Sequence, residues 1–262
     1  MLNSDTARSV IDHALYMGAD FAELFIDKCQ TNNIATLSDQ VQSVQSGIDF
    51  GIGLRIAYGQ KVLYGFTNDT EREELKRIAT DLAAKDRRDP QTTARSFDYC
   101  RATEQHPASR TISKDAEVAD KVTYLLAADR TARSTKDLIS HTKGYCLQRE
   151  QAIEVFNSEG LQIEDTRHYT RAGLTAIAAG DGEQATGTCN DGGLKGWELV
   201  DEIDAETTGN EAARQAMINL KAQSCPSGRM PVVIGPGFGG VIFRSEERRV
   251  GKECSSRCSP YH

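Results

Sequence analysis

Residues 51–67 read Gly-Ile-Gly-Leu-Arg-Ile-Ala-Tyr-Gly-Gln-Lys-Val-Leu-Tyr-Gly-Phe-Thr, and this stretch decides the fold class. Apolar side chains occupy alternate positions on both sides of Gly59-Gln60, namely Ile52, Leu54, Ile56 and Tyr58 before it and Val62, Tyr64 and Phe66 after it. An alternation with a period of two is typical of a strand with one buried face, and a glycine between two such strands suits a tight turn. The stretch therefore predicts a β-hairpin with one buried face.

Further strands and four helices are predicted around this hairpin. Strands are expected near residues 21–28, 33–46, 138–147, 150–156, 161–168, 171–179 and 230–234. Apolar residues recur with helical spacing in residues 4–17, after Thr70, in residues 114–131 and after Thr208. A glutamate follows each of these two threonines by three positions, which predicts two capping boxes. Trp197 is expected to be a packing anchor. We therefore expect an α+β fold in which helices pack on antiparallel sheets.

The composition excludes several classes of protein. The chain has 262 residues, of which 39% are hydrophobic, which suits one large domain or two small ones. It contains no run of about 18 apolar residues, and its start lacks the basic and apolar regions of a signal peptide, so we expect neither a membrane span nor a leader. A formal charge of −7 argues against a nucleic-acid surface. Seven scattered cysteines favour reduced thiols and a cytoplasmic location.

The residues alone offer only weak candidates for a functional site. Residues 235–240 match a Gly-x-Gly-x-x-Gly pattern, but no βαβ unit precedes them, so we interpret them as a tight turn rather than a nucleotide site. His141 and His168 are predicted to lie in strands and could meet across the sheet, although no carboxylate or cysteine stands at ligand spacing. His13 is expected on the flank of the apolar face of the first helix, as a surface or boundary histidine, and His106 in a solvated linker. No catalytic, cofactor-binding or metal-binding residue is assigned.

Three groups of residues resemble a single protein family. They are residues 18–25 with 51–55, residues 157–160 with 164–167, and residues 213–220 with 226–235 and 237–243. The third group is the most specific, and it includes the run Pro-Ser-Gly-Arg-Met-Pro-Val-Val-Ile-Gly. On these stretches the chain resembles the TldD/PmbA family, and within it the TldD branch, over about residues 1–243.

This resemblance implies a cytoplasmic metallopeptidase that cuts small or unfolded peptides inside a closed dimer. It also implies that a zinc-bearing TldD subunit pairs with a related metal-free subunit or with itself. In the TldD branch, a segment like residues 241–243 leads into a His-Glu-x-x-x-His helix, whose histidines hold zinc and whose glutamate acts as a general base. Here Arg244 and Ser245 follow instead, and the motif occurs nowhere in the chain. No metal ligand is therefore carried over, and what remains resembles the N-terminal domain that helps to form the substrate cleft.

Residues 244–262 differ from the rest of the chain. They begin Arg-Ser-Glu-Glu, the translation of a common sequencing-adapter oligonucleotide, AGA-TCG-GAA-GAG, and the following residues continue that likeness. Residues that derive from an adapter carry no information about the fold, so residues 244–262 do not enter the fold prediction. We interpret residues 1–225 as a TldD-like N-terminal domain, residues 226–243 as the start of a truncated metalloprotease domain, and residues 244–262 as adapter read-through. This interpretation also excludes from any zinc site three side chains spaced four apart, Cys254, Cys258 and His262.

Three functions remain open on the sequence. The first is the N-terminal fragment of a TldD-like zinc metallopeptidase, which is inactive as written because the zinc motif is missing. The second is a metal-free PmbA-like partner subunit with a binding role, and the third is a nucleotide-binding module. The Gly-rich turn before Val-Ile-Phe favours the zinc branch. The expected partners of the full-length protein are a peptide substrate and a TldD/PmbA-type subunit, with no nucleic acid and no membrane.

The source gene beyond codon 243 tests this interpretation. We expect long-read sequencing to give a histidine at position 244, a glutamate at 245 and a second histidine at 249. Roughly two hundred further residues should follow, which is the size of another domain. Several independent reads that keep Arg244 and Ser245 and stop after His262 would contradict both the artefact and the zinc peptidase.

Overall fold

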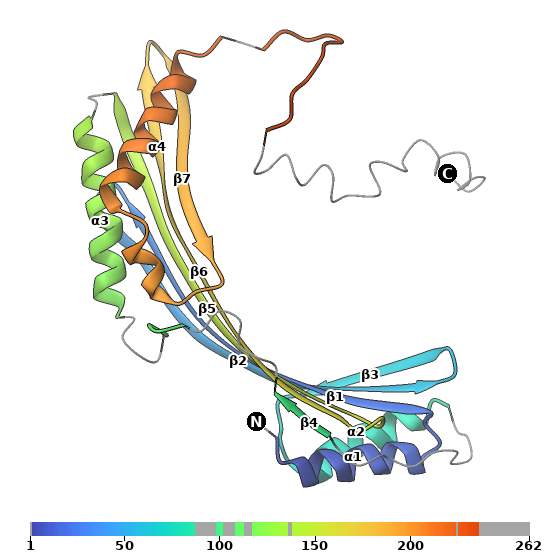
Figure 1. Cartoon of the computed structure of the whole chain (residues 1–262). Helices are drawn as coiled ribbons and strands as arrows, with labels where there is room; N and C mark the ends of the chain where they lie inside the picture. The colour runs from blue at the N-terminus through green and yellow to red at the C-terminus, as the bar shows by residue number, and fades with distance from the viewer. Residues whose placement is uncertain are drawn as a thin grey trace. The chain divides into compact units, whose positions relative to one another are not determined.

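The computed structural model describes residues 2–86, 98–101, 108–112, 117–135, 138–223 and 225–235 (Figure 1). The chain divides into two units, Met1–Ala222 and Gln223–His262. Every described helix and strand belongs to the first unit. His106 and residues 244–262 lie outside the described residues.

One seven-stranded sheet organises the described part of the first unit. Its strands are β1 (Phe21–Leu37), β2 (Gln40–Tyr58), β3 (Lys61–Thr67), β4 (Asp98–Arg101), β5 (Ile139–Asn157), β6 (Leu161–Gly180) and β7 (Glu183–Gly193). The order is β3-β2-β1-β5-β6, and β4 and β7 pair with different parts of β6. These neighbours are antiparallel, except that β4 runs parallel to β6. The predicted α+β fold with antiparallel sheet is confirmed.

Two helices cover one face of β1, β2 and β3. They are α1 (Ser4–Tyr16) and α2 (Arg72–Ala83) (Figure 1). α1 begins after Asn3, whose side chain accepts the amide of Asp5, and the chain leaves the helix through Gly18, whose φ of 93° suits glycine. The core between helices and strands includes Val10, Ile11, Leu15, Leu24, Ile26, Ile52, Leu54, Ile56, Leu75 and Phe156. These residues alternate on the strands and recur with helical spacing on α1 and α2, which confirms the helix predicted at the N-terminus.

A second pair of helices packs on β5, β6 and β7. α3 (Val118–Thr135) and α4 (Ala205–Leu220) form a core with these strands that is rich in alanine, including Ala128, Ala132, Ala176, Ala178, Ala212, Ala213 and Ala216. Small side chains let the backbones approach closely. On β7, Gly187 lies so near the main chain of α4 that a Cβ would overlap it. Trp197, at the start of the 3-10 helix η1 (Trp197–Asp201), is fully buried, which confirms it as a packing anchor.

The predicted hairpin forms, but its second strand presents the opposite face. The two-residue turn at Gly59-Gln60 makes Ile56 the partner of Leu63. Directly paired residues lie on the same face of a sheet, so Leu63 faces the helices and its neighbours face away. The expectation of one buried apolar face is therefore wrong for β3, because the turn sets the register. The side chains left exposed are Val62 at 57%, Tyr64 at 60% and Phe66 at 80%.

The strands are longer and fewer than the sequence predicts. The two strands expected near residues 21–28 and 33–46 are parts of one hairpin, because the turn falls at Ser38-Asp39, inside the second range. Both turn residues have positive φ, 44° and 69°. The alternation of apolar and polar residues cannot predict this conformation. Likewise the strands expected near residues 138–147 and 150–156 form the continuous β5.

Three local predictions about ends of elements are wrong. Thr70 does not cap α2, which begins after Glu71, and Thr208 lies inside α4, whose cap is Asp204. Asp204 accepts the amide of Thr207, so the first turn is satisfied without a capping box. Residues 230–234 form no strand, because a strand needs a neighbour and none pairs with them within the described ranges.

The close contact of β7 with α4 gives a stability prediction. We expect Gly187→Ala to lower the free energy of unfolding by about 2 kcal/mol, because the new methyl group must displace the helix backbone. Gly193→Ala on the same strand is the control, since its Cβ would meet only the Lys195 side chain at 3.9 Å. Urea unfolding of both variants measures the difference. Equal free energies for the two variants would show that α4 is not held against β7 at this distance.

Candidate functional site

A groove of ≈ 380 Å³ lies on the face of β1, β2 and β3 that points away from α1 and α2. Phe25 on β1 and Phe66 on β3 both pair with Gly53 on β2, so two aromatic side chains flank a glycine in one row across three strands. Two positions along β2, Gly51 pairs with Asp27. Gly51 leaves its part of the groove floor without a side chain, and the aromatic rings form the walls of the groove.

The two glycines have different surroundings. A Cβ on Gly53 would overlap the ring and hydroxyl group of Tyr64, so this aromatic side chain lies over the glycine. A Cβ on Gly51 would meet only the carbonyl oxygen of Thr67, at 3.9 Å. The space above Gly51 is therefore open to a ligand. A glycine inside a strand often marks such a close approach or an open position, and the Gly-x-Gly spacing was the sequence signal that could have revealed the groove.

The other end of the groove is acidic. Asp27 accepts hydrogen bonds from Nε2 of Gln151 at 3.1 Å. Cys29 pairs with Asp49 across the strands, and its sulfur accepts the Nε–H of Arg149 at 3.0 Å. Among the residues that the structure describes, neither Asp27 nor Asp49 forms an ion pair. The groove thus joins exposed aromatic rings to two carboxylates that form no ion pair within the described ranges.

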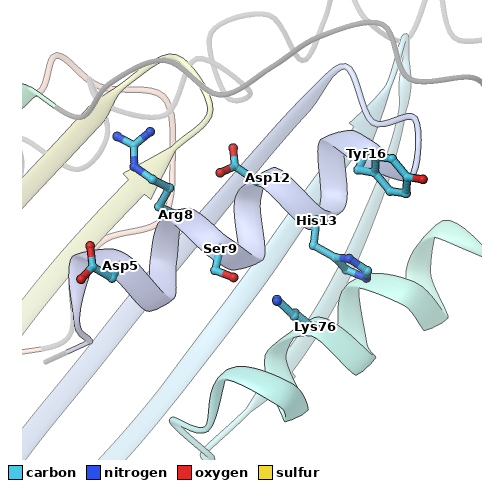
Figure 2. Close-up of a pocket in the computed structure, with 7 residues that line it drawn as sticks. All are labelled: Asp5, Arg8, Ser9, Asp12, His13, Tyr16 and Lys76. Atoms are coloured by element: carbon cyan, nitrogen blue, oxygen red, sulfur yellow. The ribbon is translucent and has the colours of Figure 1, made fainter.

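A second hollow, of ≈ 430 Å³, lies between α1 and α2 (Figure 2). His13 of α1 and Lys76 of α2 extend into the space between the helices, and Nε2 of His13 is 2.9 Å from Oγ1 of Thr80. Burial and then the charge of Lys76 lower the pKa of His13. Acidic and basic side chains balance along its rim, namely Asp5, Asp12, Arg8 and Lys76. This balance favours a solvated surface, and His13 is the boundary histidine that the sequence predicts.

The helix α3 carries a buried lysine. Lys121 is fully buried, its Nζ donates to Oδ1 of Asn32 at 2.8 Å, and it lies 5.8 Å from the centroid of the Trp197 ring. Burial lowers the pKa of Lys121, an effect that the nearby Cys146 partly opposes, and burial raises the pKa of Cys146 to about 12. These contacts join α3 to β1 and η1. Sequence reasoning missed Lys121, because a lysine on a helix usually faces solvent.

The two strand histidines do not meet. The β5–β6 register pairs His168 with Glu150, which is roughly nine positions, or about 30 Å, from His141 along β5. Nδ1 of His168 lies 3.9 Å from Oε1 of Glu150, whereas Nδ1 of His141 lies 3.4 Å from Oγ of Ser38. The prediction that they could form a joint site is wrong. Within the described ranges, no three side chains of His, Cys, Asp or Glu are grouped to hold a metal ion.

The remaining sequence candidates fall mostly beyond what the structure covers. Residues 236–240 of the Gly-rich turn lie outside the described residues, as do Cys254, Cys258 and His262. In the described ranges, no helix combines the length and the apolar character that crossing a bilayer requires.

Two models of one protein family match this chain in sequence order. Residues 22–85 match domain 1 of the PmbA/TldA metallopeptidases, and residues 112–220 match the central domain of the same proteins. Together the two matches cover more than half of the chain. The chain belongs to the TldD/PmbA metallopeptidase family. Domain 1 covers the strands and helix from β1 to α2, and the central domain runs to the end of α4.

Individual proteins and a solved structure are also similar to this chain. A metalloprotease TldD homolog of Haemophilus influenzae is 24% identical, over 92% of this chain and 52% of the relative. A metalloprotease of Methanothermobacter thermautotrophicus is 27% identical, over 86% of this chain and 48% of the relative. A crystal structure from Bacteroides thetaiotaomicron, named as a candidate modulator of DNA gyrase, superposes with a TM-score of 0.69 at 16% identity, over 87% and 53% of the two chains. The chain spans about half the length of the curated relatives it matches.

In this TldD/PmbA family member, the stretch between the two matched domains returns to the sheet. Within residues 108–112, the carbonyl oxygen of Arg110 accepts the amide of Trp197 at 2.7 Å and Nε2 of Gln148 at 3.3 Å. The amide of Arg110 donates to the carboxylate of Glu198 at 2.9 Å. The segment therefore links β5 to η1 through its main chain, a connection that composition alone could not reveal.

The buried thiol of Cys146 gives a pH prediction. Its pKa is about 12 in the folded chain against an ordinary value of 9.0, so it ionises first in the unfolded chain as pH rises. Its contribution to stability is therefore complete below pH 9.0 and is lost toward pH 12. The stability difference between wild type and Cys146→Ala should shrink by up to about 1.4 kcal/mol per pH unit in that window. Urea unfolding measures it, with the exposed Cys225 as the site of a control Cys→Ala variant. A difference that stays constant with pH would contradict the buried environment.

Proposed function

We propose that this chain is the N-terminal, substrate-cleft part of a TldD-like zinc metallopeptidase that processes small or unfolded peptides. The observation that carries the proposal is the match to two successive family domains, which share one continuous sheet. The similarity to a TldD homolog extends over 92% of the chain, which supports the zinc branch. In the cytoplasm, the full-length protein would act as a dimer with itself or with a PmbA-type subunit.

The chain as written would not hydrolyse peptides. A catalytic zinc ion needs about three protein ligands and a bound water, and the family motif places two histidines five positions apart on a helix. The five histidines of this sequence are all much farther apart than that. Among the side chains that the structure describes, no three of His, Cys, Asp or Glu are grouped to hold a metal ion. The metal and the general base would belong to the C-terminal part of the full-length protein.

Metal content and hydrolysis test the proposal together. The two proteins to compare are the 262-residue chain and the full-length product of the source gene, both dialysed before elemental analysis. We expect about one zinc ion per full-length chain and chelator-sensitive cleavage of an unstructured peptide, and neither property in the shorter chain. A stoichiometric zinc ion in the shorter chain would overturn the proposal. A full-length protein without zinc would also overturn it, and would instead support the metal-free partner subunit.

A further inference from the structure

We propose that the groove on the open face of β1, β2 and β3 binds an extended basic peptide segment, in which an apolar side chain and a Lys or Arg side chain stand two positions apart. This inference goes beyond the proposed function, because binding here needs neither zinc nor the C-terminal part of a peptidase. It rests on the walls, the floor and the charge of the groove.

The walls provide the apolar subsite. Phe25, Tyr64 and Phe66 are 38%, 60% and 80% exposed, although large aromatic side chains gain most from burial. They gather on β1 and β3, on both sides of Gly53 of β2, rather than being scattered over the surface. A contiguous group of exposed rings commonly marks a binding surface. An apolar side chain lying against Phe66 and Tyr64 would cover part of this area.

The floor provides access for a main chain. Gly51 has no side chain and no close neighbour above it, so a peptide can lie near the backbone of β2. The last pair between β2 and β3 is Ile52 with Thr67, and in the described residues no strand lies beyond β2 from Gly51 back to Gln40. The groove is therefore open at the edge of the sheet. An extended segment can enter it from that side without displacing another strand.

The charge selects the second side chain. Apart from Cys29 and Tyr64, the titratable groups that line the groove are Asp27 and Asp49, both acidic. Arg149 interacts electrostatically with Asp27, but its side-chain hydrogen bond goes to the sulfur of Cys29. A Lys or Arg side chain could pair with the carboxylates while its stem lies along an aromatic ring, which combines an ion pair with a cation–π contact.

The spacing of the two subsites matches an extended peptide. Gly53, between the rings, and Gly51, beside Asp27, are two positions apart on β2, or about 7 Å. Asp49 lies two positions farther along. Side chains at positions i and i+2 of an extended peptide point to the same side at the same spacing of about 7 Å. An apolar residue in the first row therefore places a basic residue at i+2 beside the carboxylates.

Filling the floor tests the site with little risk to the fold. In Gly51→Val, the new Cβ would meet only the carbonyl oxygen of Thr67 at 3.9 Å, and a β-branched side chain suits a strand. Gly47→Val is the matched control: it lies on the same strand and the same face but outside the groove, and its Cβ would meet only Oγ1 of Thr31 at 3.7 Å. Circular dichroism and unfolding midpoints establish that both variants fold.

Fluorescence anisotropy measures binding to the full 262-residue chain. The probe is a fluorescein-labelled peptide, Ser-Gly-Phe-Ser-Arg-Gly-Ser, and the comparison peptide carries Glu in place of Arg. We expect the Arg peptide to bind at least about tenfold more tightly, and its affinity to fall with added salt as charges are screened. Gly51→Val should weaken this binding about tenfold or more, whereas Gly47→Val should change it less than about twofold.

The carboxylates are tested separately. The double variant Asp27→Asn, Asp49→Asn keeps the shape of the groove, and it should remove the preference for Arg over Glu while retaining weak binding through the rings. Equal binding of the two peptides to wild type, or unchanged binding to Gly51→Val, would overturn the proposal. Self-association of the wild-type chain that Gly51→Val abolishes, seen by sedimentation without peptide binding, would overturn it in favour of a second copy as the occupant.

Discussion

The pairing of β1 with β5 is the interaction on which the rest of the structure depends. Fifteen residues of β1, from Glu23 to Leu37, pair with Asn157 to Lys143 of β5. This ladder joins the strands of domain 1 to those of the central domain in a single sheet. β1 contributes Leu24 and Ile26 to one hydrophobic core and Ile34 to another. The pair α1 and α2 and the pair α3 and α4 therefore both pack on the sheet that contains β1, and the two pairs need not contact each other.

Both notable features of the surface and the interior also depend on β1. Phe25 and Asp27 line the open groove, while Asn32, several residues later, holds the buried Nζ of Lys121. Successive side chains of a strand point to opposite faces of the sheet. In this part of β1, the odd-numbered residues therefore face the groove and the even-numbered residues face the helices. A one-residue slip of β1 would move Leu24 and Ile26 out of the core and turn Asp27 toward it, so the register is strongly specified.

The sequence predicted the classes of element well and their faces less well. The alternation around Gly59-Gln60 predicts the hairpin, but it cannot say that Leu63, rather than Phe66, lies on the side of Ile56, because the length of the turn decides that. The burial of Lys121 escapes sequence reasoning for a similar reason: it depends on Asn32 and Trp197, which are distant in the chain. The only sequence signal for the groove was the pair of glycines Gly51 and Gly53 in one strand. This signal could not predict the groove alone, because side chains that line it also come from β1 and β3.

The β1–β5 ladder also has a consequence for the chain as the ribosome makes it. β2 follows β1 directly, but the partner for the other edge of β1 is synthesised roughly a hundred residues later. At about 5–20 residues per second, that edge of a seventeen-residue strand waits for several seconds or longer with unpaired amides and carbonyls. Unpaired edges recruit other strands, and non-local pairing of this kind is slow to form. Nascent chains halted between β3 and β5 would therefore be the most prone to aggregate, and α1, which is made first, can shield only a face of β1 and not its edge.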